Sequence, residues 1–253
     1  RFLYALKQEA DYEIISYEGG QKDNAITREA ICEILVARED VEAVKVSAAK
    51  AEDGLREEYA GTDGNITFQI TEEGHAETDV LHPTSREKVL FYLVQIPFGI
   101  QKMSGNIEGL VETSTNIGIV KLSDDEFFAR SSVRSSVEVA RDALSDKIQY
   151  LTEFLGGEYE IQGAYPAWEY RKDSPLRDKM VSVYEEMYGQ KPEVVAIHAG
   201  LECGLFYKKI EGLDCVSLGP NMKDIHTSEE VLDIASTERV WNYLVKVLEQ
   251  LKD

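Results

Sequence analysis

The sequence has few of the residues that build disulfide frameworks or compact zinc sites. Its 253 residues include three cysteines and four histidines, with no Cys-x-x-Cys and no His-Glu-x-x-His pattern. The odd number of cysteines (Cys32, Cys203 and Cys215) excludes a fully paired disulfide framework and favours a reducing compartment, with the cytoplasm as the expected one. A zinc ion needs three or four protein ligands. The scattered histidines therefore predict no complete zinc site within this chain.

Long apolar runs and an excess of positive charge are also missing. No run approaches the roughly 18 residues that a membrane-spanning helix needs, and no signal-peptide pattern opens the chain. Acidic residues number 47 against 27 basic ones, which gives a net charge of −20. Such a surface repels phosphates and anionic lipids, so neither nucleic acid nor membrane is expected as a partner. Arg1 lies in a helical pattern with no cap before it, so the chain is expected to begin inside an element.

Apolar spacing predicts alternating helices and strands over the first 163 residues. The expected helices cover 1–10, 24–37, 48–59, a segment from a capping box at Thr84 and Glu87 to Pro97, and a segment from Ser135 or Ser136 to Gly156. The expected strands cover 12–17, 41–46 and 65–71, with a hairpin formed by 114–121 and 126–133. This pattern predicts an α+β sheet flanked by helices.

The pattern changes after Gly163. The sequence predicts apolar strands over 194–197 and 215–218, and helices beginning at Ser174, over 200–206 and over 231–251. Continuous apolar strands that alternate with helices are typical of a layered α/β domain. The fold class is therefore predicted as α/β and α+β, with one domain over 1–163 and a second over 164–253.

Candidate chemistry gathers where the two apolar strands of the second part end. His198 and Gly200 follow the first strand, and His226 follows the second. Ligands of open α/β sheets bind at the carboxyl ends of strands, where glycines allow close approach to the backbone. A lone histidine there is more often a hydrogen-bonded loop residue than a metal ligand, although Glu202 and His198 nearby favour the metal hypothesis for His226. Cys203 is more typical of a small buried thiol than of a nucleophile.

Several motifs together resemble the aminoacyl-histidine (Xaa-His) dipeptidase branch of the M20 zinc metallopeptidases. In the second part they are Gly-Ala-Tyr-Pro-Ala-Trp at 163–168, His-Ala-Gly-Leu-Glu-Cys-Gly-Leu-Phe at 198–206, and Ser-Leu-Gly-Pro at 217–220 with His-Thr-Ser-Glu-Glu at 226–230. In the first part they are Gly20 to Ile26 with the following Arg-Glu-Ala at 28–30, Gly109 to Asn116, and Val133 to Ser136. The resemblance covers essentially the whole chain.

This resemblance implies an enzyme that hydrolyses dipeptides with a water bridged by two zinc ions, activated by a glutamate base. His226 matches a metal ligand of the family, and Gly200 matches a residue whose backbone meets the substrate. Asn24 and Arg134 match substrate-binding residues of the lid domain, and an arginine suits the carboxylate of a dipeptide because its planar fork binds in two places. Arg130, four residues earlier, is the competing candidate.

The resemblance further implies a homodimer formed through the lid domain, residues 1–163. The family's His-x-Asp ligand pair, bridging aspartate, Glu-Glu pair and Gly-Gly-His-Ser-Gly loop have no counterpart in this sequence, and they are expected to precede Arg1. The chain by itself is therefore expected to be inactive. Two alternatives stay open, a non-catalytic lid-type dimerisation or binding module and an unrelated thiol hydrolase that uses Cys203 with His198.

Overall fold

The computed structural model describes residues 1–123, 125–195, 202–225 and 229–252. The chain forms two compact units. The first unit contains Arg1–Gln101, Ser114–Val133 and Asp142–Glu160, and the second contains Lys102–Thr113, Arg134–Arg141 and Ile161–Asp253. The predicted mixed α/β character is confirmed, whereas the domain boundary at Gly163 stays a prediction.

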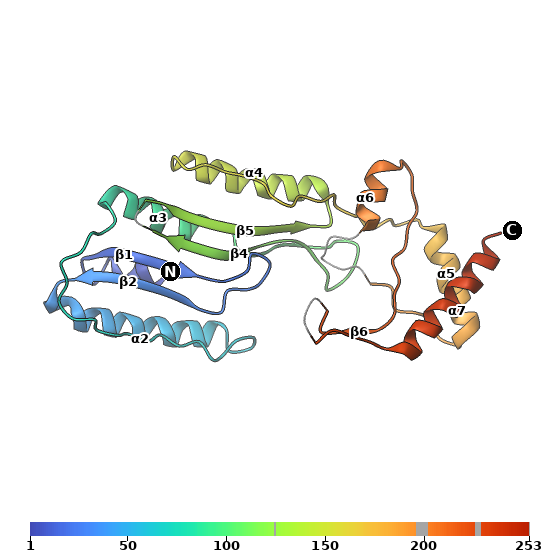
Figure 1. Ribbon diagram of the computed structural model, residues 1–253, viewed down its shortest axis with the longest axis horizontal. Coiled ribbons are helices and arrows are strands. Elements are labelled where there is room, and N and C mark those ends of the chain that lie inside the picture. Colours follow the sequence, from blue (N-terminus) through green and yellow to red (C-terminus); the bar gives the residue numbers. More distant parts are fainter. Residues whose placement is uncertain (124, 196–201, 226–228, 253) are drawn as a thin grey trace. The chain divides into compact units, whose positions relative to one another are not determined.

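Five strands form the main sheet (Figure 1). They are β1 (Tyr12–Gly19), β2 (Ala30–Val36), β3 (Gly99–Met103), β4 (Val111–Leu122) and β5 (Phe127–Ser135). The order is β2-β1-β4-β3, and β5 also pairs with β4, as the predicted hairpin requires. β1 and β2 are antiparallel, with a register shift between Ile14 and Ser16. The short β3 was not predicted from the sequence.

Helices cover this sheet and bury two apolar clusters in the first unit. The helices are α1 (Phe2–Leu6), α2 (Val41–Glu58), α3 (Pro83–Gln95) and α4 (Glu138–Phe154), with a 3-10 turn at Arg38–Asp40. α2 runs alongside β2, and α4 runs alongside β5 (Figure 1). Leu6 and Ile14 are fully buried in the first cluster. Tyr92 and Ile148 centre the second cluster, between α3 and α4.

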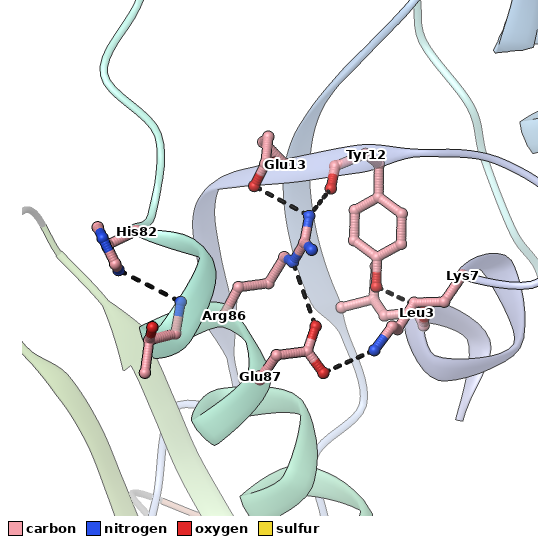
Figure 2. A network of polar contacts seen from close by, with 8 residues as sticks. Leu3, Lys7, Tyr12, Glu13, His82, Arg86 and Glu87 are labelled. Carbon is pink, nitrogen blue, oxygen red and sulfur yellow. Dashed lines mark hydrogen bonds and ion pairs between the residues drawn. The ribbon is translucent and has the colours of Figure 1, made fainter.

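Polar contacts around Arg86 join α1, β1 and α3 (Figure 2). The guanidinium donates to the Tyr12 carbonyl oxygen and forms an ion pair with Glu13 at 3.0 Å. Glu87, the next residue on α3, accepts from Lys7, the C-cap of α1, at 2.6 Å. That hydrogen bond lowers the pKa of Glu87. Because these elements are distant in sequence, the contacts fix the start of α3 against the sheet.

In the second unit a pair of helices forms the apolar core. α5 (Pro175–Tyr188) packs against α7 (Ile234–Gln250) through Met180, Val183, Tyr243 and Val247. The Tyr243 hydroxyl donates to the Met180 carbonyl oxygen at 2.7 Å. α6 (Glu202–Lys209) and the two-residue strands β6 (Met222–Lys223) and β7 (Val231–Leu232) complete the described elements. In the described ranges, every helix is too short or too polar to cross a lipid bilayer.

Two predictions for residues 24–46 are wrong. The expected helix over 24–37 is instead a loop followed by β2, in which Cys32, Ile34 and Val36 alternate toward the core. This two-residue period is typical of a half-buried strand and overrides the helical spacing that also fits the segment. The expected strand over 41–46 is the beginning of α2, whose buried residues Val44 and Ala48 are four apart, as on one helix face.

Two further segments differ from the prediction: one lacks the expected strand, and the other is a helix with a different N-cap residue. Residues 65–71 form no strand, although Phe68 is half-buried against Phe2. A side chain of α2 takes the place of a partner strand here, since the Phe68 N–H donates to the Glu52 carboxylate at 2.6 Å. α3 begins one residue before Thr84, and His82 is its cap, with Nδ1 accepting from the Thr84 N–H at 3.3 Å.

The strands expected in the second unit are wrong wherever the structure describes them. Val194 and Val195 are 46% and 62% exposed and belong to no strand, and residues 196–197 lie outside the described ranges. Residues 215–218 are also irregular. Two predictions about helix ends are confirmed. Ser174 caps α5 by accepting from the Arg177 N–H, and α4 ends before Gly156, whose φ is +85°.

Candidate functional site

Asn24 lies on the loop between β1 and β2, which crosses directly over β4. The loop is closed at its base, where the Gly20 N–H donates to the Glu29 carbonyl oxygen at 3.2 Å. A Cβ at Gly20 would lie 1.9 Å from the Gly118 carbonyl oxygen, and one at Gly118 would lie 2.3 Å from the Lys22 carbonyl oxygen. Only glycines allow this approach. The crossing therefore fixes the backbone on the N-terminal side of Asn24.

Two hydrogen bonds fix the other side of the same loop. Asn116 of β4 donates from Nδ2 to the Ala25 carbonyl oxygen at 2.6 Å. Thr27 donates from its hydroxyl to the Ile117 carbonyl oxygen at 3.0 Å. Asn24 itself is exposed. A rigid loop that carries an exposed amide suits substrate recognition, because little conformational freedom is lost on binding.

Sequence reasoning missed the positioning role of Asn116, Thr27 and the two crossing glycines. Gly118 was the available signal, because a glycine inside a strand often marks close approach of another backbone. Asn116 has one more notable feature. Its Oδ1 is buried and has no hydrogen-bond partner among the residues that the structure describes.

Arg134 and Arg130 lie on one face of β5. Phe127, Ala129 and Val133 of this strand pack against the second apolar cluster of the first unit. Because side chains alternate along a strand, the even-numbered residues face the other side. Arg130 stacks over the Phe128 ring at 5.6 Å, and Arg134 is half-buried. The arginines share a face, so the alternation does not distinguish between them as carboxylate ligands.

Gly200 and His226 lie outside the described residues, and so does His198. Glu202, in the first turn of α6, is exposed. Asp224, two residues before His226, has a φ of +51°. Asn24 belongs to the first unit and Arg134 to the second. The grouping of Asn24, Arg134, Gly200 and His226 into one site therefore stays a prediction.

Two sequence motifs pack against each other within the second unit. A Cβ at Gly204 of α6 would lie 2.8 Å from the Pro166 carbonyl oxygen, so the start of α6 contacts the segment 163–168. Arg141 donates to the Tyr165 carbonyl oxygen at 2.6 Å and pairs with Glu138 at 3.3 Å. Glu138 in turn pairs with Lys208 of α6 at 2.8 Å.

This network keeps a carboxylate charged beside two cations. The hydrogen bond from Lys208, with smaller contributions from Arg141, lowers the pKa of Glu138. The side chains of these pairs are partly exposed and screened by solvent, so each pair stabilises by less than about 1 kcal/mol. Their value is in orientation, since they connect the first turn of α4, the segment 163–168 and α6, all within the second unit.

The described residues do not fit a zinc pair. In the ranges that the structure covers, no three His, Cys, Asp or Glu side chains are grouped so that they could hold a metal ion. A hydrolytic zinc needs about three protein ligands and one open position. No step of a reaction is therefore assigned to a metal from the described residues.

Comparison with known proteins shows first the class of the chain, a peptidase, and then its family. The chain belongs to peptidase family M20/M25/M40, which it matches over residues 5–250. It is 30% identical to the cytosol non-specific dipeptidase of Escherichia coli (strain K12) over 251 residues. This matched region covers 99% of this chain and 52% of that protein. The family and its dipeptidase branch, expected from the motifs, are thereby confirmed.

Solved structures agree with this assignment. The crystal structure of aminoacylhistidine dipeptidase from Vibrio alginolyticus matches with a TM-score of 0.90 and 31% identity, over 99% of this chain and 51% of that one. The aminopeptidase PepT from Bacillus cereus matches with a TM-score of 0.52 and 15% identity, over 67% of this chain and 46% of that one, which indicates a shared fold only. The chain spans about half the length of both dipeptidases.

Proposed function

We propose that the chain is part of a zinc dipeptidase of the Xaa-His type, located in the cytoplasm. The observation that carries the proposal is the likeness to aminoacylhistidine dipeptidase over 99% of the chain, at a TM-score of 0.90. The E. coli relative is named as a cytosolic enzyme, which supports the proposed location. In this proposal the chain contributes substrate-binding residues and one metal ligand, while the general base and the other metal ligands are not among its described residues.

Asn24 and Arg134 are proposed to bind the dipeptide, Asn24 through its amide and Arg134 through the terminal carboxylate. The clamped loop beneath Asn24 supports the first role. An arginine supports the second because its two parallel N–H donors match a carboxylate in geometry and charge. Gly200 is proposed to meet the substrate through its backbone, and His226 to contribute one imidazole to a zinc site.

The arginine assignment is tested with a dipeptide and its C-terminal amide as paired substrates of the active dipeptidase. Arg134→Lys keeps the charge and loses the fork. We expect the ratio of kcat/KM for the acid to kcat/KM for the amide to fall roughly tenfold or more. The matched control is Arg130→Lys, which should leave the ratio unchanged. If the ratio fell in Arg130→Lys and not in Arg134→Lys, the substrate carboxylate would be assigned to Arg130.

The zinc assignment is tested on the 253-residue chain itself. With His226 as the only family-matched ligand, we expect weak zinc binding and no dipeptide hydrolysis. Isothermal titration with zinc and an assay of Xaa-His cleavage measure both properties. Tight binding of two zinc ions, or zinc-dependent turnover by this chain, would contradict the proposal. A lid-type module that takes no part in catalysis would leave kcat/KM unchanged on Arg134→Lys, Arg130→Lys and Asn24→Ala.

A homodimer through the first unit is also proposed. β2 ends the strand order of the sheet, and Ile31 on this strand is 65% exposed. An open strand edge with apolar side chains favours pairing with another chain. Sedimentation equilibrium of the chain should give a dimer, and Ile31→Lys should shift it toward monomer. A strict monomer at high protein concentration would refute the proposal.

A further inference from the structure

Cys203 and Cys215 approach each other in the second unit. Cys203 lies in the first turn of α6, and Cys215 lies in the irregular segment that follows the turn at Gly212. Cys215 Sγ is 3.9 Å from the Cys203 carbonyl oxygen. Burial, followed by the charge and the hydrogen bond of the Cys203 thiol, raises the pKa of Cys215 to about 11. The two thiols are therefore direct neighbours, and neither is fully exposed.

The backbone on both sides of this thiol pair is restrained. Gly204, next to Cys203, packs so closely on Pro166 that α6 cannot shift toward it. Asp214, next to Cys215, accepts from the Ser174 hydroxyl at 2.7 Å and from the Leu176 N–H at 3.0 Å. These contacts keep the two cysteines near each other. Disulfide formation brings two sulfur atoms to about 2 Å with Cα atoms roughly 5.5 Å apart, so the proposed bond depends on these two restrained segments staying side by side.

Trp168 lies beside the same pair. Its side chain hydrogen-bonds to Cys215, as one of the influences on the pKa of that thiol. Its Cβ would be 3.5 Å from a Cβ at Gly204. The indole is therefore a natural optical probe of the two sulfur atoms.

We propose that Cys203 and Cys215 are a dithiol site that hydrogen peroxide converts reversibly to an intramolecular disulfide. In the first step one thiolate attacks peroxide, the O–O bond breaks, and a sulfenic acid and water form after proton transfer. In the second step the other thiol attacks the sulfenic sulfur, the S–S bond forms, and a second water leaves. Two thiols are oxidised by two electrons and one peroxide is reduced to two waters.

The order of the two steps follows from the environment of the thiols. The attacking species is a thiolate, and the raised pKa keeps Cys215 protonated at neutral pH. Cys203 is therefore expected to react first, and Cys215 to resolve the sulfenic acid. Cys32 is an internal reference, because it packs against the core of the first unit and burial raises its pKa to about 12.

Peroxide titration of the 253-residue chain tests the proposal without reference to peptidase activity. We expect the mass to fall by two hydrogen atoms and peptide mapping to place the bond between Cys203 and Cys215. Cys32 should stay reduced, with its thiol lost roughly tenfold more slowly. A reductant such as dithiothreitol should restore three free thiols. In a Trp241→Phe background the fluorescence of Trp168 should drop on oxidation and recover on reduction.

Matched variants sharpen the result. Cys32→Ser should form the bond as before, whereas Cys203→Ser and Cys215→Ser should not. In Cys215→Ser the remaining Cys203 should proceed to sulfinic acid, while in Cys203→Ser the protonated Cys215 should stay largely a thiol. Mapping of the unaltered chain keeps the test valid if a serine variant fails to fold. Separate over-oxidation of Cys203 and Cys215 in the unaltered chain, or a bond from either to Cys32 or to another chain, would overturn the proposal.

Discussion

The two units of the chain differ in how their apolar side chains are used. The first unit buries two clusters between a sheet and four helices, with Leu6 and Ile14 fully covered. The second buries one cluster between α5 and α7. Several apolar residues of α7 outside that cluster are exposed, including Ile234 at 83% and Trp241 at 64%. An apolar pattern thus shows that side chains favour burial, but it does not identify the surface that covers them.

The largest effect should come from opening a cavity in either core. Ile14→Ala should lower the free energy of unfolding by about 2–5 kcal/mol, and Val183→Ala by about 1.5–3 kcal/mol, because each side chain is fully buried. Both tryptophans belong to the second unit. In urea, Ile14→Ala should therefore shift the circular-dichroism transition more than the fluorescence transition, and Val183→Ala should do the opposite.

The control for this pair is Val46→Ala, on the outer face of α2, at a residue that is 53% exposed. It should change the free energy of unfolding by no more than about 0.5–1 kcal/mol. If all variants moved both signals together, the two units would unfold as one cooperative body, and the comparison between them would fail.

The loop crossing in the first unit gives the next effect. Gly20 has a φ of +75°, and a Cβ there would meet the Gly118 carbonyl oxygen. Gly20→Ala should destabilise the first unit by about 2–4 kcal/mol through backbone strain and displacement of the loop. In contrast, Gly54→Ala places a Cβ in open space inside α2, and should stabilise by about 0.5–1 kcal/mol.

Urea unfolding followed by circular dichroism measures both glycine variants. If Gly20→Ala is added to the active dipeptidase, it should also raise KM, because the loop beneath Asn24 moves. An unchanged stability in Gly20→Ala would mean that the loop does not cross β4 as tightly as the structure has it.

Much of the first unit could be predicted from the sequence because its patterns are local. The strand at Tyr12, the hairpin of β4 and β5, and the end of α4 at Gly156 each follow from spacing or turn residues within a few positions. The prediction of a helix over 24–37 was wrong because the apolar residues of this segment fit both a helical and a strand spacing. Pairing with β1 favours the strand. When a segment fits both spacings, contacts with residues distant in sequence determine its secondary structure, and the periodicity of the segment gives no information about those contacts.

The candidate site was predictable to a different degree. Motif resemblance pointed to Asn24 and Arg134, but not to Asn116, whose role depends on a loop that folds back across 91 residues of sequence. In the second unit, Val194 and Val195 have the composition of a buried strand and are exposed. Their apolar pattern indicates that the two side chains favour burial, but the described residues of this chain do not cover them.

The smallest effect concerns a carboxylate that supports the core helix of the second unit. Asp214 accepts hydrogen bonds from the Ser174 hydroxyl and the Leu176 N–H at the start of α5. Burial acts to raise the pKa of Asp214, but these hydrogen bonds and the charges of Arg171 and Arg177 outweigh it and lower the pKa below the ordinary 3.8. A lowered pKa in the folded state stabilises the protein above the unfolded value, and this contribution is lost as pH falls through the folded value.

Asp214→Asn should therefore reduce stability at pH 7, and this loss should shrink as pH falls below the ordinary 3.8 toward the lowered folded pKa, because the native carboxylate becomes protonated there. The difference should be below about 1 kcal/mol, since Asp214 is only half-buried and solvent screens its interactions. Tryptophan fluorescence during thermal unfolding between pH 7 and pH 2 measures it in the second unit. The matched control is Asp178→Asn, in the first turn of α5, whose side chain is 73% exposed, and which should not alter the pH profile. An equal loss of stability at pH 7 and pH 2 in Asp214→Asn would show that the residue acts through packing or amide geometry, because a charge effect must disappear with the charge.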